Sequence, residues 1–170
     1  ADDTPILPLR GRPKLYVEKL AAEVAGRYGE VVADIEAADW VILRLETPYQ
    51  PRDGNFLERM FHAGDLDFKG EEKARILGLL QQKPTIVVIH LDRPAVIPEI
   101  AAQSVALLGE FGASDEAVLD VIFGHFAPVG NLPFELPSSM EAVRQQHPDL
   151  PYDSANPLFC FGAGLRYGET

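Results

Sequence analysis

The sequence has 170 residues, of which 46% are hydrophobic, so the chain is long enough to bury a core as a single domain. Its 15 Lys and Arg residues against 26 Asp and Glu residues give a net charge of −11, the reverse of a nucleic-acid-binding surface and unfavourable for an anionic membrane. No apolar run approaches the ~20 residues of a membrane-spanning helix.

The first thirteen residues contain Pro5, Pro8 and Pro13 and show little periodicity. Proline fixes the backbone and lacks an amide donor, so residues 1–13 are expected to be an extended linker or docking arm. The rest of the chain, residues 14–170, is expected to form one domain.

Short apolar runs predict strands that alternate with helices. The expected strands cover residues 15–17, 30–33, 40–45, 84–91 and 105–108. The run at 40–45 is apolar except for Arg44, which predicts burial on both faces, as in a parallel sheet. Helical spacing follows at residues 20–28, 71–82, 97–102 and 115–122. This alternation predicts an α/β three-layer sandwich, a mostly parallel sheet of about six strands flanked by helices on both faces.

The helix after the last expected strand has clear boundaries. Ser114 or Asp115 is expected to cap its first turn, and Gly124 to end it. Its apolar face is expected to consist of Ala117, Val118, Val121 and Ile122.

The C-terminal part beyond Pro137 has weaker signals. Residues 138–147 favour a helical turn or two, and residues 158–167 an extended piece. The single cysteine, Cys160, lies between apolar residues and is expected to be a buried thiol with no disulfide or metal partner.

Residues 46–70, called the long segment below, are the longest stretch without a clear element. Ligands of parallel sheets bind beyond the carboxyl ends of the strands, so this segment is expected at the functional edge. Carboxylates can transfer protons and aromatic rings can stack on sugars. The segment carries Glu46, Asp53, Glu58, Asp65 and Asp67 with Tyr49, Phe56, Phe61 and Phe68. Taken by itself, this composition also fits a solvated loop with apolar anchors.

Other kinds of site have little support in the sequence. No GxGxxG or P-loop follows a strand, and the four histidines lack metal-ligand spacing, so no cofactor and no metal site is expected. His90 lies in a strong strand and is expected to be a satisfied core or edge residue. Topology alone also allows a flavodoxin-like nucleotide domain, but no loop that could cradle a phosphate is present.

Two motifs near the C-terminus carry a resemblance. Residues 119–124 read LDVIFG and residues 127–137 read APVGNLPFELP. They resemble the Ala-Asp-Val-Leu-Phe-Gly and Asn-Pro-(Ser/Ala)-Gly-(Arg/Lys)-Leu-Pro motifs of the C-terminal α/β domain of glycoside hydrolase family 3, the family of many β-glucosidases. Residues 156–167, NPLFCFGAGLRY, are similar to that family's Pro-Leu-(Tyr/Phe)-Pro-Phe-Gly-(His/Tyr)-Gly-Leu-Ser-Tyr. The resemblance covers roughly residues 14–168.

The resemblance implies a role in retaining hydrolysis, which needs two carboxylates. The nucleophile Asp would lie on an N-terminal (β/α) barrel domain of the same enzyme, and this domain would cover the pocket and lend a Glu as general acid/base. Counting back from residues 66–68 favours Glu58. Counting forward from the preceding strand instead reaches Gln50 or Pro51, neither of which can donate a proton.

Glu46 is therefore the second candidate for the acid, and Asp53 the third. We expect Asp53, His62 and Phe61 to contact the substrate, a β-glucoside or oligosaccharide. The alternative is a non-catalytic lid or sugar-binding module. The resemblance favours a periplasmic or secreted location, with a cytoplasmic one also open, and implies no nucleic-acid or membrane partner.

Overall fold

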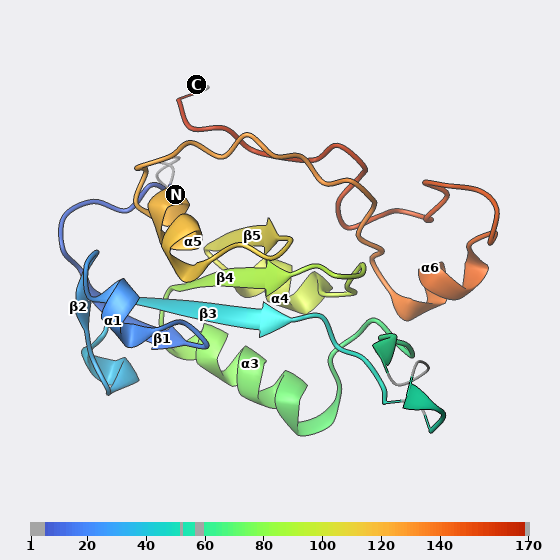
Figure 1. The fold of residues 1–170 in the computed structure, drawn as a ribbon, viewed down its shortest axis with the longest axis horizontal. Helices are drawn as coiled ribbons and strands as arrows, with labels where there is room; N and C mark the ends of the chain where they lie inside the picture. Colours follow the sequence, from blue (N-terminus) through green and yellow to red (C-terminus); the bar gives the residue numbers. More distant parts are fainter. Residues whose placement is uncertain (1–5, 52, 57–59, 169–170) are drawn as a thin grey trace.

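A parallel sheet runs through the centre of the fold (Figure 1). The computed structural model describes residues 6–51, 53–56 and 60–168, and in this part of the chain the sheet has five strands. They are β1 (Lys14–Glu18), β2 (Glu30–Val31), β3 (Trp40–Glu46), β4 (Thr85–His90) and β5 (Ala106–Glu110). Their order is β2-β1-β3-β4-β5, and all neighbouring pairs are parallel. The predicted α/β class and parallel sheet are confirmed, with five strands against the expected number of about six.

Helices cover both faces of this sheet and give the predicted three layers (Figure 1). The helical elements are α1 (Ala22–Ala25), the 3-10 turn η1 (Ile35–Ala37), α3 (Gly70–Gln82), α4 (Pro98–Gln103), α5 (Asp115–Ile122) and α6 (Met140–Gln145). Ile76 of α3 and Ile100 of α4 join the core cluster on one face, whereas Ala25 of α1 and Leu119 of α5 join the cluster on the other. Side chains of β3 and β4 alternate between the two clusters, because successive strand residues point to opposite faces.

The first helix is shorter than predicted. The pattern over residues 20–28 becomes helix only at Ala22–Ala25, and Gly26 caps it by donating its N–H to the carbonyl of Ala22. Gly29 approaches the start of β1 so closely that a Cβ there would lie 2.5 Å from the carbonyl oxygen of Pro13. The chain therefore leaves the helix early and turns into β2 through Gly29, a position with no room for a side chain.

The middle of the proline-rich stretch lies against the end of α5. The Leu9 side chain is only 4% exposed, and its backbone N–H donates to the carbonyl of Ile122 at 2.9 Å. The side chain of Pro8 fills the space where a Cβ on Gly124 would stand. The proline-rich stretch is thus docked on the core, while its separation from the domain at residue 13 stays a prediction.

The boundaries of α5 are as predicted, but its apolar face is different. Ser114 is the cap, with its Oγ accepting from the N–H of Ala117, and Gly124 follows the helix with φ at +74°. The buried side chains are Val118, Leu119 and Ile122, whereas Ala117 is exposed. The buried face is therefore rotated by part of a turn from the predicted one. The helix packs against the sheet and against Pro8 and Leu9, and Leu119 takes a buried position that was predicted for the smaller Ala117.

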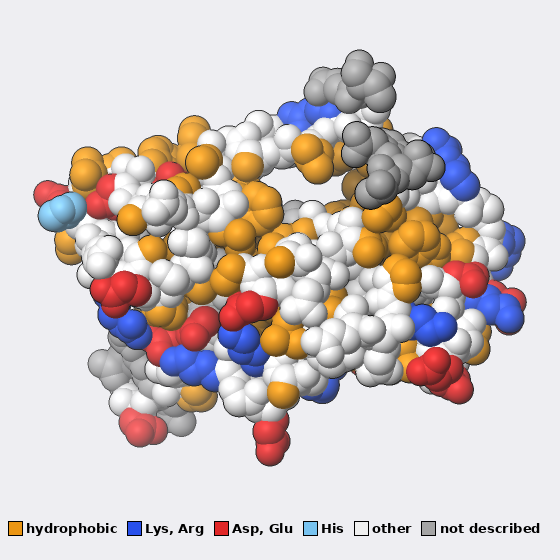
Figure 2. Space-filling model, turned by 180° about the vertical axis from the view of Figure 1, so that it is seen from behind, with side chains coloured by type: hydrophobic (Ala, Val, Ile, Leu, Met, Phe, Trp, Pro, Cys, Tyr) orange, Lys and Arg blue, Asp and Glu red, His pale blue; other side chains and the backbone are white. Residues whose placement is uncertain are grey.

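The two motifs that carry the family resemblance lie side by side along the surface. Leu132 N–H donates to Ala163 O at 2.9 Å, Gly162 N–H donates back to Leu132 O at 2.9 Å, and Leu136 and Phe159 form an isolated antiparallel bridge. This pair of segments arches over the sheet layer, and Figure 2 shows the hollow beneath it, bordered by hydrophobic side chains. Cys160 lies here and is exposed, so the expectation of a buried thiol is wrong. Apolar neighbours in sequence bury a residue only where a second layer covers it.

Candidate functional site

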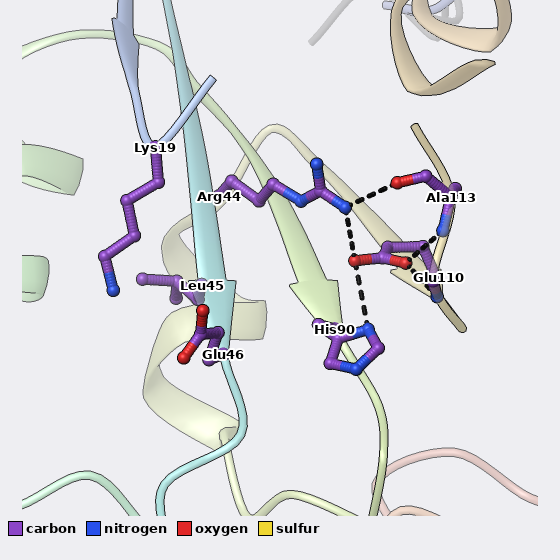
Figure 3. Close-up of a pocket in the computed structure, with 8 residues that line it drawn as sticks. Lys19, Arg44, Leu45, Glu46, His90, Glu110 and Ala113 are labelled. Atoms are coloured by element: carbon purple, nitrogen blue, oxygen red, sulfur yellow. Dashed lines mark hydrogen bonds and ion pairs between the residues drawn. The ribbon is translucent and has the colours of Figure 1, made fainter. Parts of the chain in front are cut away.

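The strand order reverses between β1 and β3, because the chain moves outward from β1 to β2 and then returns. In open α/β sheets, ligands bind at such switch points, beyond the carboxyl ends of the strands. The structure has a cavity of about 350 Å³ at this edge, called the edge pocket here. It is lined by Lys19, Arg44, Leu45, Glu46, His90, Glu110, Gly112 and Ala113 (Figure 3).

Glu110 is the most enclosed charged group of the edge pocket, with a side chain only 7% exposed. One oxygen accepts from the Arg44 guanidinium at 2.8 Å, and the Nδ1 of His90 lies 3.2 Å from the same oxygen. The other oxygen accepts from the backbone N–H groups of Gly112 at 2.6 Å and Ala113 at 2.8 Å. Burial raises the pKa of Glu110, but these donors outweigh it and hold the pKa at about 2.

Arg44 explains the break in the apolar strand. Its guanidinium donates to Glu110, to Asp115 at 2.5 Å and to the carbonyl of Ala113 at 2.7 Å. Burial lowers the pKa of Arg44, but the two carboxylates raise it above its ordinary value. One half-buried cation therefore ties the end of β3 to the end of β5 and to the start of α5. The sequence signal was the single charge inside an apolar run.

The low pKa of Glu110 predicts a pH dependence of stability. Its ordinary pKa is 4.5 and its folded value about 2, so this carboxylate stabilises the fold above pH 4.5 and the contribution is lost as pH falls toward 2. We expect urea unfolding midpoints of the wild-type chain to fall more steeply between pH 5 and pH 3 than those of Glu110→Gln. Parallel pH profiles for the two proteins would contradict this.

Two further charged groups line the edge pocket on the other side of β3. Figure 3 shows the Lys19 ammonium and the Glu46 carboxylate there, apart from the group formed by Arg44, Glu110 and His90. Glu46 is exposed, and it pairs with His90 in the register of β3 and β4. The second acid candidate thus lies at the carboxyl edge, as topology predicted for its strand, and His90 is satisfied by Glu110.

The long segment leaves this same edge and extends beyond the sheet (Figure 1). His62, near its end, stacks on Tyr49 near its start, with ring centroids 3.9 Å apart, and pairs with Asp92 in the turn after β4. Phe61 is 69% exposed and Asp53 is also exposed. Of the three residues predicted to contact the substrate, His62 contacts Tyr49 and Asp92 of its own chain. The side chains of Phe61 and Asp53 are exposed.

Glu58, the first candidate for the acid, lies outside the described residues. The base of the long segment involves contacts that the sequence did not indicate, above all those made by Asp92 and Arg93. Arg93 donates to the carbonyl of Gly64 at 2.6 Å. In the sequence, the Asp-Arg-Pro run at residues 92–94 indicates a turn and does not point to a contact with the long segment.

A model of the "Glycosyl hydrolase family 3 C-terminal domain" matches residues 4–167. The chain belongs to glycosyl hydrolase family 3. The resemblance expected from the two C-terminal motifs is therefore confirmed, and it extends into the proline-rich arm.

Named relatives of this family 3 domain are longer proteins. "Beta-glucosidase C" of Emericella nidulans is 48% identical over 170 residues, which cover 97% of this chain and 27% of that protein. The "Periplasmic beta-glucosidase/beta-xylosidase" of Dickeya chrysanthemi is 40% identical over 95% of this chain and 25% of its own length. The chain thus spans about a quarter of the length of these relatives.

Solved family 3 structures share the fold of this domain at low identity. A β-glucosidase from Listeria innocua in complex with isofagomine has a TM-score of 0.66 at 18% identity, covering 96% of this chain and 31% of that one. β-Glucosidase 3B from Thermotoga neapolitana has a TM-score of 0.67 at 15% identity, covering 95% and 35%. At this identity the likeness shows the fold.

Two kinds of feature are absent from the residues that the structure describes. None of the helices in these residues combines the length and the apolar character of a membrane-spanning segment. Within the same residues, no group of three or more His, Cys, Asp or Glu side chains could hold a metal ion.

Proposed function

We propose that this domain covers the sugar pocket of a retaining β-glucosidase-type enzyme and lends it the general acid/base. The observation that carries the proposal is the similarity to a protein named a β-glucosidase. That protein is 48% identical to this chain over nearly the whole chain, and the chain spans 27% of its length. The rest of such an enzyme supplies the barrel domain with the nucleophile. Retention needs both carboxylates on opposite sides of the glycosidic bond, about 5–5.5 Å apart.

The geometry of the carboxyl edge supports a role for this domain beside a sugar pocket that is shared with a second domain. The long segment leaves the sheet next to the switch point, where ligands of such sheets bind. Its exposed side chains include Phe56, 74% exposed, and Phe61, 69% exposed. Large exposed apolar side chains on one segment fit a surface that meets another part of the enzyme or a sugar ring. Glu58 belongs to the same segment and is our first candidate for the proton donor, with Glu46 second.

The stereochemistry of the full-length enzyme tests the reaction class. Retaining hydrolysis inverts the anomeric carbon twice, so glucose released from 4-nitrophenyl β-D-glucopyranoside should appear first as the β-anomer in a proton NMR time course. The matching β-xyloside is the informative second substrate, because one relative carries both names. First release of the α-anomer, or no cleavage of any β-glycoside, would refute the proposal.

A further inference from the structure

Three side chains hold the base of the long segment together. The imidazole of His62 stacks on the ring of Tyr49, with the ring planes 7° from parallel and the centroids 3.9 Å apart. The Nδ1–H of His62 donates to the carboxylate of Asp92 in the turn after β4. We call Tyr49, His62 and Asp92 the loop-base cluster. It connects the outgoing part of the segment, the returning part and the neighbouring strand.

Backbone contacts reinforce this connection. The N–H of Gln50 donates to the carbonyl of Ala63 at 2.8 Å, and the two residues form an isolated antiparallel bridge. Gly64 follows with φ at +85°, and a Cβ there would clash with the side chain of Gln50. Its carbonyl accepts from Arg93 at 2.6 Å. The turn after β4 therefore holds the returning chain at two adjacent points, through Asp92 and Arg93.

A loop closed in this way has fewer conformations than one anchored at its strand ends alone. This matters for a proton donor, which must lie within hydrogen-bond reach of the leaving oxygen. A misplacement of about 1 Å can cost about 10²-fold in rate. The loop-base cluster stands at the ends of the stretch that contains Glu58.

We propose that His62 is a positioning residue for the acid of the long segment, acting through Tyr49 and Asp92. The inference rests on the proposed function, in which Glu58 donates the proton. One face of the imidazole is covered by Tyr49, and its Nδ1 is bonded to Asp92. Both contacts of His62 are thus with its own chain, and its effect on catalysis follows from where it holds the segment.

The kinetic test compares leaving groups in the full-length enzyme. We expect His62→Ala to lower kcat/KM for cellobiose or methyl β-D-glucopyranoside by about 10- to 100-fold. The value for 2,4-dinitrophenyl β-D-glucopyranoside should change little, because that leaving group needs no proton. Asp92→Asn should act in the same direction, and combining it with His62→Ala should add much less than the sum. Tyr49→Phe keeps the stack and should retain wild-type behaviour.

His125 offers a matched control. It also pairs through Nδ1 with a carboxylate, Asp120 at 3.0 Å, and also lies beside a tyrosine ring, Tyr28 with centroids 5.4 Å apart. It follows α5, away from the edge pocket. We expect His125→Ala to leave the ratio of the two kcat/KM values unchanged, although it removes the same kind of pair.

Hydrogen exchange of the full-length enzyme provides a second readout. Amides of residues 53–56, 60 and 61 should exchange faster in His62→Ala than in wild type or His125→Ala. Faster exchange with an unchanged leaving-group ratio would show a purely structural contact and overturn the positioning role. If Glu58→Ala shows the leaving-group effect and His62→Ala does not, this inference fails while the proposed function stands. If neither variant shows it, the assignment of the acid to Glu58 fails as well.

Discussion

Replacing Glu58 with alanine in the full-length enzyme should slow the hydrolysis of β-glucosides with poor leaving groups by about 10²–10⁴-fold in kcat/KM. The physical reason is that an alkoxide leaving group must receive a proton as the glycosidic bond breaks. A dinitrophenolate leaves without one, so its kcat/KM should remain close to the wild-type value. Steady-state kinetics on a series of aryl and alkyl β-glucosides, plotted against leaving-group pKa, measures the effect as a steeper slope.

The activity of the Glu58→Ala variant should increase when azide is added. The second step of a retaining mechanism normally needs the acid/base residue to take a proton from water. Azide carries no such proton, so it should raise kcat of Glu58→Ala on the dinitrophenyl substrate and form the β-glucosyl azide. Wild-type enzyme should not respond. Glu71→Gln, which changes an exposed carboxyl in the first turn of α3, is the control for altered charge.

The position of the acid can be read from the pattern across variants. If Glu46→Ala shows the leaving-group dependence and azide response while Glu58→Ala does not, the acid is the residue at the end of β3. If neither Glu46→Ala nor Glu58→Ala shows them, the domain contributes no acid at these positions. In that case the domain acts as a non-catalytic lid over the sugar pocket.

Replacing Arg44 with methionine should lower the free energy of unfolding of the 170-residue chain by about 3–5 kcal/mol. The change removes the cation that lies against Glu110 and Asp115, and it leaves the enclosed Glu110 carboxylate with His90 and two backbone N–H groups but without the guanidinium. A loss of this size is a large part of the total stability of a typical domain, about 5–15 kcal/mol. Urea unfolding followed by circular dichroism measures it.

Arg75 on α3 is the matched control for this prediction. It also pairs with two carboxylates, Glu18 at 2.6 Å and Glu72 at 3.0 Å, but its side chain is 38% exposed. Water and salt screen such pairs, so Arg75→Met should cost less than about 1 kcal/mol. Equal losses for the two variants would show that enclosure at the edge pocket does not strengthen the Arg44 pairs.

The layers of the fold could be predicted from the sequence because they follow from local periodicity. The continuous apolar runs of β3 and β4 require two covered faces, and the alternation with helices makes a parallel sheet the simple solution. Capping chemistry is equally local, which is why Ser114 and Gly124 bounded α5 correctly. The apolar face of α5 was less predictable, since Val118, Leu119 and Ile122 are selected by what packs against them.

The candidate site could be predicted only in part, for a related reason. Topology placed the long segment at the carboxyl edge, and Glu46 lies there at the end of its strand. The edge pocket, in contrast, brings together residues from four strand ends. Its central pair, Arg44 and Glu110, is separated by 66 positions. No spacing rule connects residues that meet only because β3, β4 and β5 lie side by side.

The sequence by itself thus determined the class of fold, the family motifs and the edge of the sheet from which the long segment leaves, because each depends on short-range patterns or on the order of elements. The tertiary structure decided the partners: Arg44 with Glu110, and His62 between Tyr49 and Asp92. It also decided that Cys160 is exposed. Burial and ion pairing depend on which surfaces meet after folding, and that information is spread over the whole chain rather than written next to any one residue.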